Sequence, residues 1–191
     1  MAPNLKFTQE QIVDVAFSIF REKGFSFVTA RHISEKMDAS TSPIYSYFKS
    51  MEALEKELEQ RCLALFTQYQ QTDRTGDIFL DLGLGVVLFA KNEPNLYKSL
   101  DSFYNSNQDQ LESKMMNQIK EVHYFKGLGE ATVRVILSKM KIFSLGLADL
   151  VLQNSPLVQT EEQIIKYLYE VGGAVILFEH VSDEEKLRIL G

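Results

Sequence analysis

The sequence predicts an all-α fold, and three observations carry that prediction. Apolar residues recur at the three- and four-residue spacing of amphipathic helices along most of the 191 residues. Thr or Ser, followed three positions later by Gln or Glu, precedes several of these runs as a helix-capping pair. No stretch alternates apolar and polar residues as a half-buried strand does, and the sequence contains no internal repeat or low-complexity segment.

The first predicted helix begins after Thr8, which forms a capping box with Gln11, and it ends at Gly24. Its apolar side chains lie at helical spacing: Ile12, Val15, Ala16, Ile19 and Phe20. Three more apolar residues follow the helix, and we expect them to close a small core: Phe25, Phe27 and Val28.

Residues 29–50, TARHISEKMDASTSPIYSYFKS, predict two short helices joined by a tight turn. Thr29 is a good N-cap for the first helix, Asp38 tolerates a left-handed backbone, and Ser40 is the predicted cap of the second helix. Pro43 is then the third residue of the second helix, where a missing N–H breaks no helical hydrogen bond. Two such helices form a helix-turn-helix, whose second helix enters the major groove of DNA.

A pattern without gaps extends through this stretch and a few residues beyond it. It comprises Thr29, Ile33, Ser40, Ile44, Tyr45, Tyr47, Phe48, Lys49, Ser50, Glu52 and Leu54. This pattern resembles the DNA-binding segment of the tetracycline-repressor (TetR) family. The resemblance implies a helix-turn-helix DNA-binding domain of three helices over residues 1–49, followed over residues 50–191 by a helical domain for ligand binding and dimerisation. Met51 departs from the pattern, because the family has there a lysine that often helps to hold phosphate.

The resemblance also implies that the first domain binds double-stranded operator DNA. Tyr45 and Tyr47 resemble tyrosines that reach phosphates, and a residue at the position of Arg31 can reach a base. The predicted DNA-binding residues are Thr29, Arg31, Thr41, Ser42, Pro43, Tyr45, Ser46, Tyr47 and Lys49. The exposed positions of the second helix carry no side chain that can make a bidentate contact to a base, so we expect these positions to discriminate only weakly between base pairs. The alternatives are a core role for the tyrosines and a solvated surface position for Arg31.

Charge is distributed unevenly along the chain, whose net charge is −6. Residues 1–50 carry six Lys and Arg against five Asp and Glu, and the rest carries 14 against 21. The first part is therefore +1 and the remainder −7. This asymmetry favours DNA contact at one end only, and strong non-specific affinity is not expected.

The remaining chain predicts a series of helices. A long helix begins after Ser50 and continues to residue 71, and residues 72–77 form a loop. The next helix, residues 77–91, is apolar nearly all round, which is typical of an interior helix. The further predicted helices cover residues 95–104, 108–122, 130–153 and 161–180, with a short terminal helix after Ser182.

Two predictions concern the second domain. Residues 130–153 and 161–180, paired with their symmetry mates, are expected to form a four-helix homodimer interface. The predicted interface residues of the second helix are Ile164, Leu168, Val171, Gly172 and Val175. Aromatic and polar side chains are expected to line a pocket of the kind that TetR-type domains enclose: Tyr97, Phe103, Tyr104, His123 and Phe143. The alternative for this second set is ordinary core packing or, for His123, plain exposure.

The sequence also argues against other classes of protein. It has no glycine-rich phosphate loop, no metal-ligand spacing and no nucleophile elbow. We therefore expect that the protein is not an enzyme, has no catalytic residues and binds neither a cofactor nor a metal. Cys62 is the one cysteine and is expected to be buried and inert. No signal segment or membrane span is apparent, which predicts a cytoplasmic protein. We expect a homodimeric repressor that a small, largely hydrophobic ligand releases from DNA; the alternative is a helical interaction protein that kept the fold but lost specific DNA binding.

Overall fold

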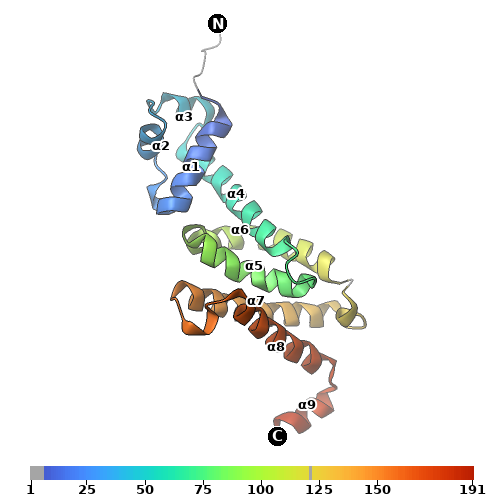
Figure 1. Ribbon diagram of the computed structural model, residues 1–191. Helices are drawn as coiled ribbons and strands as arrows, with labels where there is room; N and C mark the ends of the chain where they lie inside the picture. Colours follow the sequence, from blue (N-terminus) through green and yellow to red (C-terminus); the bar gives the residue numbers. More distant parts are fainter. Residues whose placement is uncertain (1–6, 121) are drawn as a thin grey trace. The chain divides into compact units, whose positions relative to one another are not determined.

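The computed structural model describes residues 7–120 and 122–191, without the side chains of residues 101, 104–112, 114, 183, 189 and 190. The described part is all-α and contains no strand, as predicted (Figure 1). It divides into two compact units, Met1–Leu65 with Glu93–Ser106, and Phe66–Asn92 with Asn107–Gly191. The domain boundary predicted at residue 49 differs from this division, two of whose three break points fall inside helices. The predicted boundary stays a prediction. No helix among the described residues is long and apolar enough to cross a membrane.

The first unit begins with α1 (Gln9–Lys23), which the predicted capping box of Thr8 and Gln11 starts. Gly24 ends α1 with a φ of 98°, a backbone conformation that glycine adopts without strain. A 3₁₀ turn, η1 (Phe25–Phe27), then leads to α2 (Ala30–Lys36), which Thr29 caps as predicted by accepting the His32 N–H. Asp38 adopts the expected left-handed backbone, with a φ of 50°.

The second helix of the motif begins later than predicted. The structure places α3 at Ser42–Tyr47, with Thr41 rather than Ser40 as the capping position and Pro43 as the second helical residue. Thr41 makes no side-chain cap, and its carbonyl accepts the Ile44 and Tyr45 N–H groups at 3.1 and 3.4 Å. The prediction was wrong by one residue because the turn uses this backbone carbonyl instead of the Ser40 hydroxyl.

A small apolar core holds the first three helices and the start of α4 (Met51–Gln71) together. Its most buried side chains include Ile12, Ala16, Phe20, Ile33, Ile44, Phe48, Leu54 and Leu58. Phe48 is thus a core residue, as predicted. Cys62 is buried too, and burial raises the pKa of its thiol to about 12, which agrees with the predicted inert thiol.

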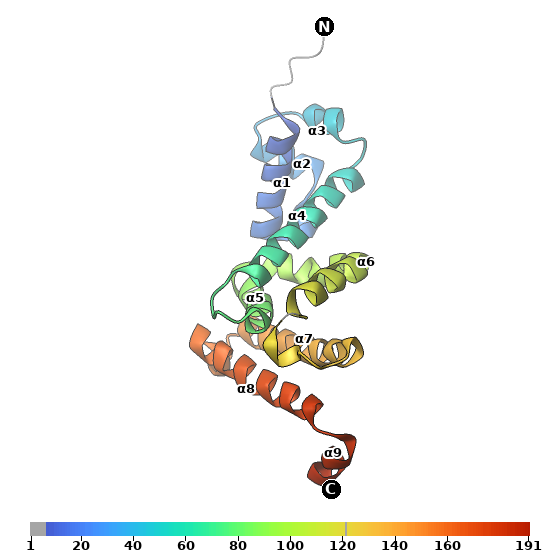
Figure 2. The same cartoon turned by 90° about the vertical axis from the view of Figure 1, so that its right-hand side faces the viewer.

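The second unit is built around α5 (Ile78–Asn92), which is buried nearly all round, as predicted for an interior helix. It packs against α7 (Glu130–Leu152) and α8 (Glu161–His180), and the three helices lie side by side in both views (Figures 1 and 2). Short 3₁₀ turns precede α7 and α8, at His123–Phe125 and Pro156–Val158. The capping boxes at Thr160 and Ser182 start α8 and the terminal α9 (Asp183–Leu190), as predicted.

One helix replaces the two that were predicted over residues 95–104 and 108–122. The structure has a continuous α6 (Pro94–Ile119), which passes through the polar SNQD stretch. Ser, Asn and Asp are poor helix formers, but each costs only about 0.5 kcal/mol inside a helix. Since this stretch has no glycine or proline, nothing in it stops the helix.

The face of α8 that was predicted for dimerisation lies largely inside the protomer, and its role in a dimer stays a prediction. Ile164, Leu168 and Gly172 are buried within the protomer, and a Cβ at Gly172 would lie 3.2 Å from Phe79 Cε1 of α5. Val171 and Val175 are half-buried and pack against the same core. An interior helix must be covered on every side, so the most apolar stripe of α8 is used to cover α5.

Candidate nucleic-acid interface

Helices α2 and α3 each bury one side and expose the other. Ile33 of α2 and Ile44 of α3 are the buried anchors. On the other side, Thr41, Ser42, Ser46 and Lys49 are exposed, Pro43 is half-buried, and Tyr45 is 52% exposed. The predicted readers on α3 are thus mostly on the surface, where a DNA groove can reach them. Ser46 Oγ donates to the Ser42 carbonyl at 2.8 Å, which leaves its lone pairs to accept from a base amino group.

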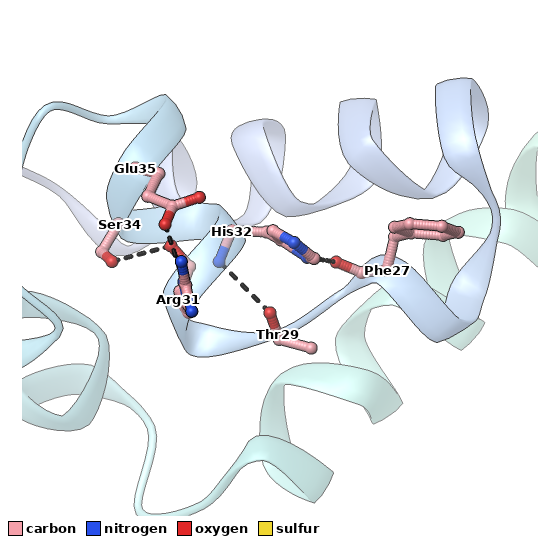
Figure 3. Close-up of polar contacts among 6 residues, drawn as sticks. All are labelled: Phe27, Thr29, Arg31, His32, Ser34 and Glu35. Atoms are coloured by element: carbon pink, nitrogen blue, oxygen red, sulfur yellow. Dashed lines mark hydrogen bonds and ion pairs between the residues drawn. The ribbon is translucent and has the colours of Figure 1, made fainter.

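Three hydrogen bonds fix the entry into α2 (Figure 3). Thr29 Oγ1 accepts the His32 N–H at 3.2 Å, and Ser34 Oγ donates to the Arg31 carbonyl at 2.9 Å. His32 Nδ1 lies 2.8 Å from the Phe27 carbonyl oxygen; since a carbonyl only accepts, Nδ1 carries the proton. The His32 and Phe27 rings also stack, with centroids 5.9 Å apart. Thr29 therefore has a structural role. Phe27 was predicted to close the small core, but it is 45% exposed and stacks on His32 instead.

Arg31 forms an ion pair with Glu35 one helical turn later. Arg31 Nε donates to Glu35 Oε1 at 2.8 Å, and the two side chains are 84% and 56% exposed (Figure 3). The hydrogen bond from Arg31 lowers the pKa of the Glu35 carboxyl, so both groups are charged at neutral pH. Glu35 was not among the predicted residues, although its four-residue spacing from Arg31 is the spacing at which such pairs form.

Tyr47 lies differently from Tyr45. Its side chain is half-buried, and its hydroxyl donates to the Phe7 carbonyl at 3.0 Å. A tyrosine has one hydroxyl proton, so Tyr47 can donate to a phosphate only if it releases Phe7. Of the two tyrosines, the exposed Tyr45 is the better placed for a phosphate contact.

Other cations of the first unit are paired with carboxylates of α1 and of the residue before α6. Lys36 Nζ lies 2.9 Å from Glu22 Oε1, and Arg61 Nη2 lies 2.6 Å from Asp14 Oδ1. Arg21 donates from Nε to Glu93 Oε2 at 2.8 Å, and Glu93 is buried. These three pairs neutralise positive charge and tie the unit together, so Arg31 and Lys49 are the predicted DNA contacts that bring a cation to the interface.

The five residues predicted to line a ligand pocket divide between the two units. Tyr97 is half-buried and Phe103 buried in the first unit, where the Phe103 ring packs edge-on against Phe20 and Phe25 at 6.1 and 5.5 Å. His123 is exposed and Phe143 half-buried in the second unit. The side chain of Tyr104 lies outside the described residues. Phe103 thus has a core role, and a pocket shared by these residues stays a prediction.

Comparison with known proteins gives an independent finding on the same segment. Residues 12–58 match the model of a family described as bacterial regulatory proteins, tetR family. The match runs from the buried Ile12 of α1 through α2 and α3 to the buried Leu58 of α4. No curated protein matches the chain.

Proposed function

We propose that the chain, a DNA-binding transcriptional regulator of the tetR family of bacterial regulatory proteins, is a homodimeric repressor. A small, largely hydrophobic ligand would release it from a double-stranded DNA operator. The observation that carries the DNA-binding part is the exposed outer side of α2 and α3 within the segment that matches the family. We expect such a regulator to act in the cytoplasm, where its operator lies.

Exposed apolar residues on α7 and α8 support the homodimer. Ile142 of α7 is 72% exposed, and Tyr169 and Leu177 of α8 are each 68% exposed. Gly173 lies between Tyr169 and Leu177 at four-residue spacing, and a Cβ added there would meet nothing within 4 Å. Large apolar side chains next to a small residue on an open surface are typical of helix faces that pack against a partner. A two-fold dimer would present two copies of α3 to two half-sites.

A selection from random duplex DNA tests the proposed function directly. Full-length protein should enrich one sequence with two related half-sites, because a two-fold dimer reads both. Failure to enrich any sequence would favour the alternative, a helical interaction protein without specific DNA binding. Met51, in place of the family's lysine, and the lack of a bidentate side chain on the exposed side of α3 are the observations that favour this alternative.

Arg31→Ala and Lys49→Ala should weaken binding to the selected duplex in different ways. Lys49→Ala should weaken binding to every sequence and lower the salt slope by about one unit, because it removes one phosphate contact. Arg31→Ala should cost about 1–3 kcal/mol, mainly at one base pair. Fluorescence anisotropy at several salt concentrations, on the selected duplex and its point variants, separates the two. An equal loss for Arg31→Ala on all point variants would remove Arg31 from the readers.

The ligand response can be tested once a compound that lowers DNA affinity is known. Since α4 and α6 each have residues in both compact units, they are the candidates for coupling ligand to DNA. Linkage requires that the selected duplex weakens ligand binding by the same factor as the ligand weakens DNA binding. Calorimetric titrations of the ligand with and without the duplex measure this factor. Equal ligand affinities would mean that the compound binds without acting as an inducer.

A further inference from the structure

The ion pair in α2 has the order of charges that a helix disfavours. Arg31 lies in the first turn of Ala30–Lys36 and Glu35 in the last turn. The helix dipole favours acidic side chains at the start and basic ones at the end, and Glu before Lys or Arg is the better order for a pair four residues apart. Both charges in α2 are therefore at the less favourable end. A pair as exposed as this one contributes little to stability even in the better order.

A second pair in the chain has the same spacing and the opposite order. In α7, Arg134 Nη2 lies 2.8 Å from Glu130 Oε1, with Glu130 in the first turn of the helix. This pair follows the dipole, as a pair that supports its own helix should. Lys166 and Glu170 of α8 also have the reversed order, but their charged atoms lie 3.9 Å apart, whereas Arg31 and Glu35 form a hydrogen bond of 2.8 Å. This closer pair in α2 is not explained by helix stability.

We propose that Glu35 is a positioning residue, which holds the Arg31 guanidinium ready to read a guanine and disfavours DNA of other sequence. Within the described part of α2 and α3, Arg31 is the side chain with the planar fork that matches guanine O6 and N7. The hydrogen bond to Glu35 uses Nε of Arg31. The two terminal amino groups of the guanidinium stay available as the two donors of an end-on contact to guanine. This inference rests on the proposed function.

Two physical effects follow from the pair. A long arginine loses much rotamer freedom when it is fixed, so an arginine that is already oriented loses less on binding. The Glu35 carboxylate also adds a negative charge beside DNA phosphates, which weakens binding wherever Arg31 finds no guanine. Lys23 of α1 and His32 of α2 also interact electrostatically with Glu35, and both are unchanged in the variants below.

The test uses full-length protein, the duplex that the wild type enriches, its point variants, and poly(dI-dC) as non-specific DNA. Glu35→Ala should lower discrimination at the base pair that Arg31 reads by about 5- to 10-fold, a part of what one bidentate contact supplies. Glu35→Gln keeps an acceptor oxygen and should retain more of that discrimination. Both variants should bind poly(dI-dC) about two- to threefold more tightly, because one negative charge is gone.

Controls separate positioning from folding. In an Arg31→Ala background, Glu35→Ala should no longer change discrimination, because Glu35 acts through Arg31. Glu130→Ala, which breaks the matched pair in α7, should leave discrimination unchanged. A purely structural role for Glu35 would instead weaken binding to all DNA and give the same change with and without Arg31.

The outcomes are distinguishable. Enrichment of a duplex by the wild type, with unchanged discrimination in Glu35→Ala, would overturn this inference alone. The same change in discrimination with and without Arg31 would overturn it as well. No enrichment by the wild type would overturn the proposed function and this inference with it.

Discussion

The double variant Ile142→Asp/Leu177→Asp should be monomeric and should bind a duplex with two half-sites about 10²- to 10⁴-fold more weakly than the wild type. A dimer that has bound one half-site holds its second copy of α3 close to the other half-site, and a monomer loses this gain. Both side chains are exposed in the protomer, so aspartate should change the free energy of unfolding by about 0.5 kcal/mol or less.

Light scattering at micromolar concentration checks the oligomeric state, and anisotropy on duplexes with one or two half-sites checks the affinity. On a single half-site the variant and the wild type should differ little. Leu187→Asp is the matched control, because Leu187 of α9 is as exposed as Ile142 and lies outside α7 and α8. A double variant that remains dimeric would place the interface elsewhere, and a monomeric wild type would exclude the dimer.

Gly85→Ala should destabilise the second unit by about 3 kcal/mol or more, the upper range for overpacking. A Cβ at Gly85 would lie 2.5 Å from both Gln70 Cα and the Tyr69 carbonyl oxygen, so α5 crosses the end of α4 at backbone contact. Backbone atoms inside a helix cannot rotate away as the end of a side chain can. Urea denaturation monitored by circular dichroism measures the loss.

Two other glycines of the second unit, Gly83 of α5 and Gly146 of α7, form a graded control. A Cβ at Gly83 would lie 2.9 Å from Leu168 Cδ2, the end of a flexible side chain, so Gly83→Ala should cost less than Gly85→Ala. A Cβ at Gly146 meets nothing within 4 Å, and Gly146→Ala should stabilise by about 0.5–1 kcal/mol, because alanine is the better helix former. Equal effects at all three positions would contradict the close approach of α5 and α4.

Local signals in the sequence were sufficient for most helix ends. The capping boxes at Thr8, Thr160 and Ser182 are each present, and Asp38 has the left-handed backbone of the turn. These features depend on residues within three or four positions of one another, so the sequence contains the information. Where two local signals were nearly equal in strength, as at Ser40 and Thr41, the prediction missed by one residue.

Part of the candidate DNA interface could also be predicted from the sequence. The exposure of Tyr45 and the core position of Phe48 follow from helical spacing together with the family pattern. The partners of the predicted residues did not follow, because Tyr47 donates to a carbonyl 40 positions earlier in the chain. The four-residue spacing of Arg31 and Glu35 allows their ion pair, but the spacing alone does not show that the pair forms.

The sequence alone determined the all-α class, the helix-turn-helix and the match of residues 12–58 to the tetR family, since each depends on short-range spacing and capping chemistry. The tertiary structure alone decided which apolar face each helix buries. Ile164 and Leu177 both belong to apolar stripes of α8, yet Ile164 is buried and Leu177 exposed, because only one side of α8 covers α5. Helical spacing gives the faces of a helix but not the neighbour that each face meets, and that neighbour is set by contacts between residues far apart in the chain.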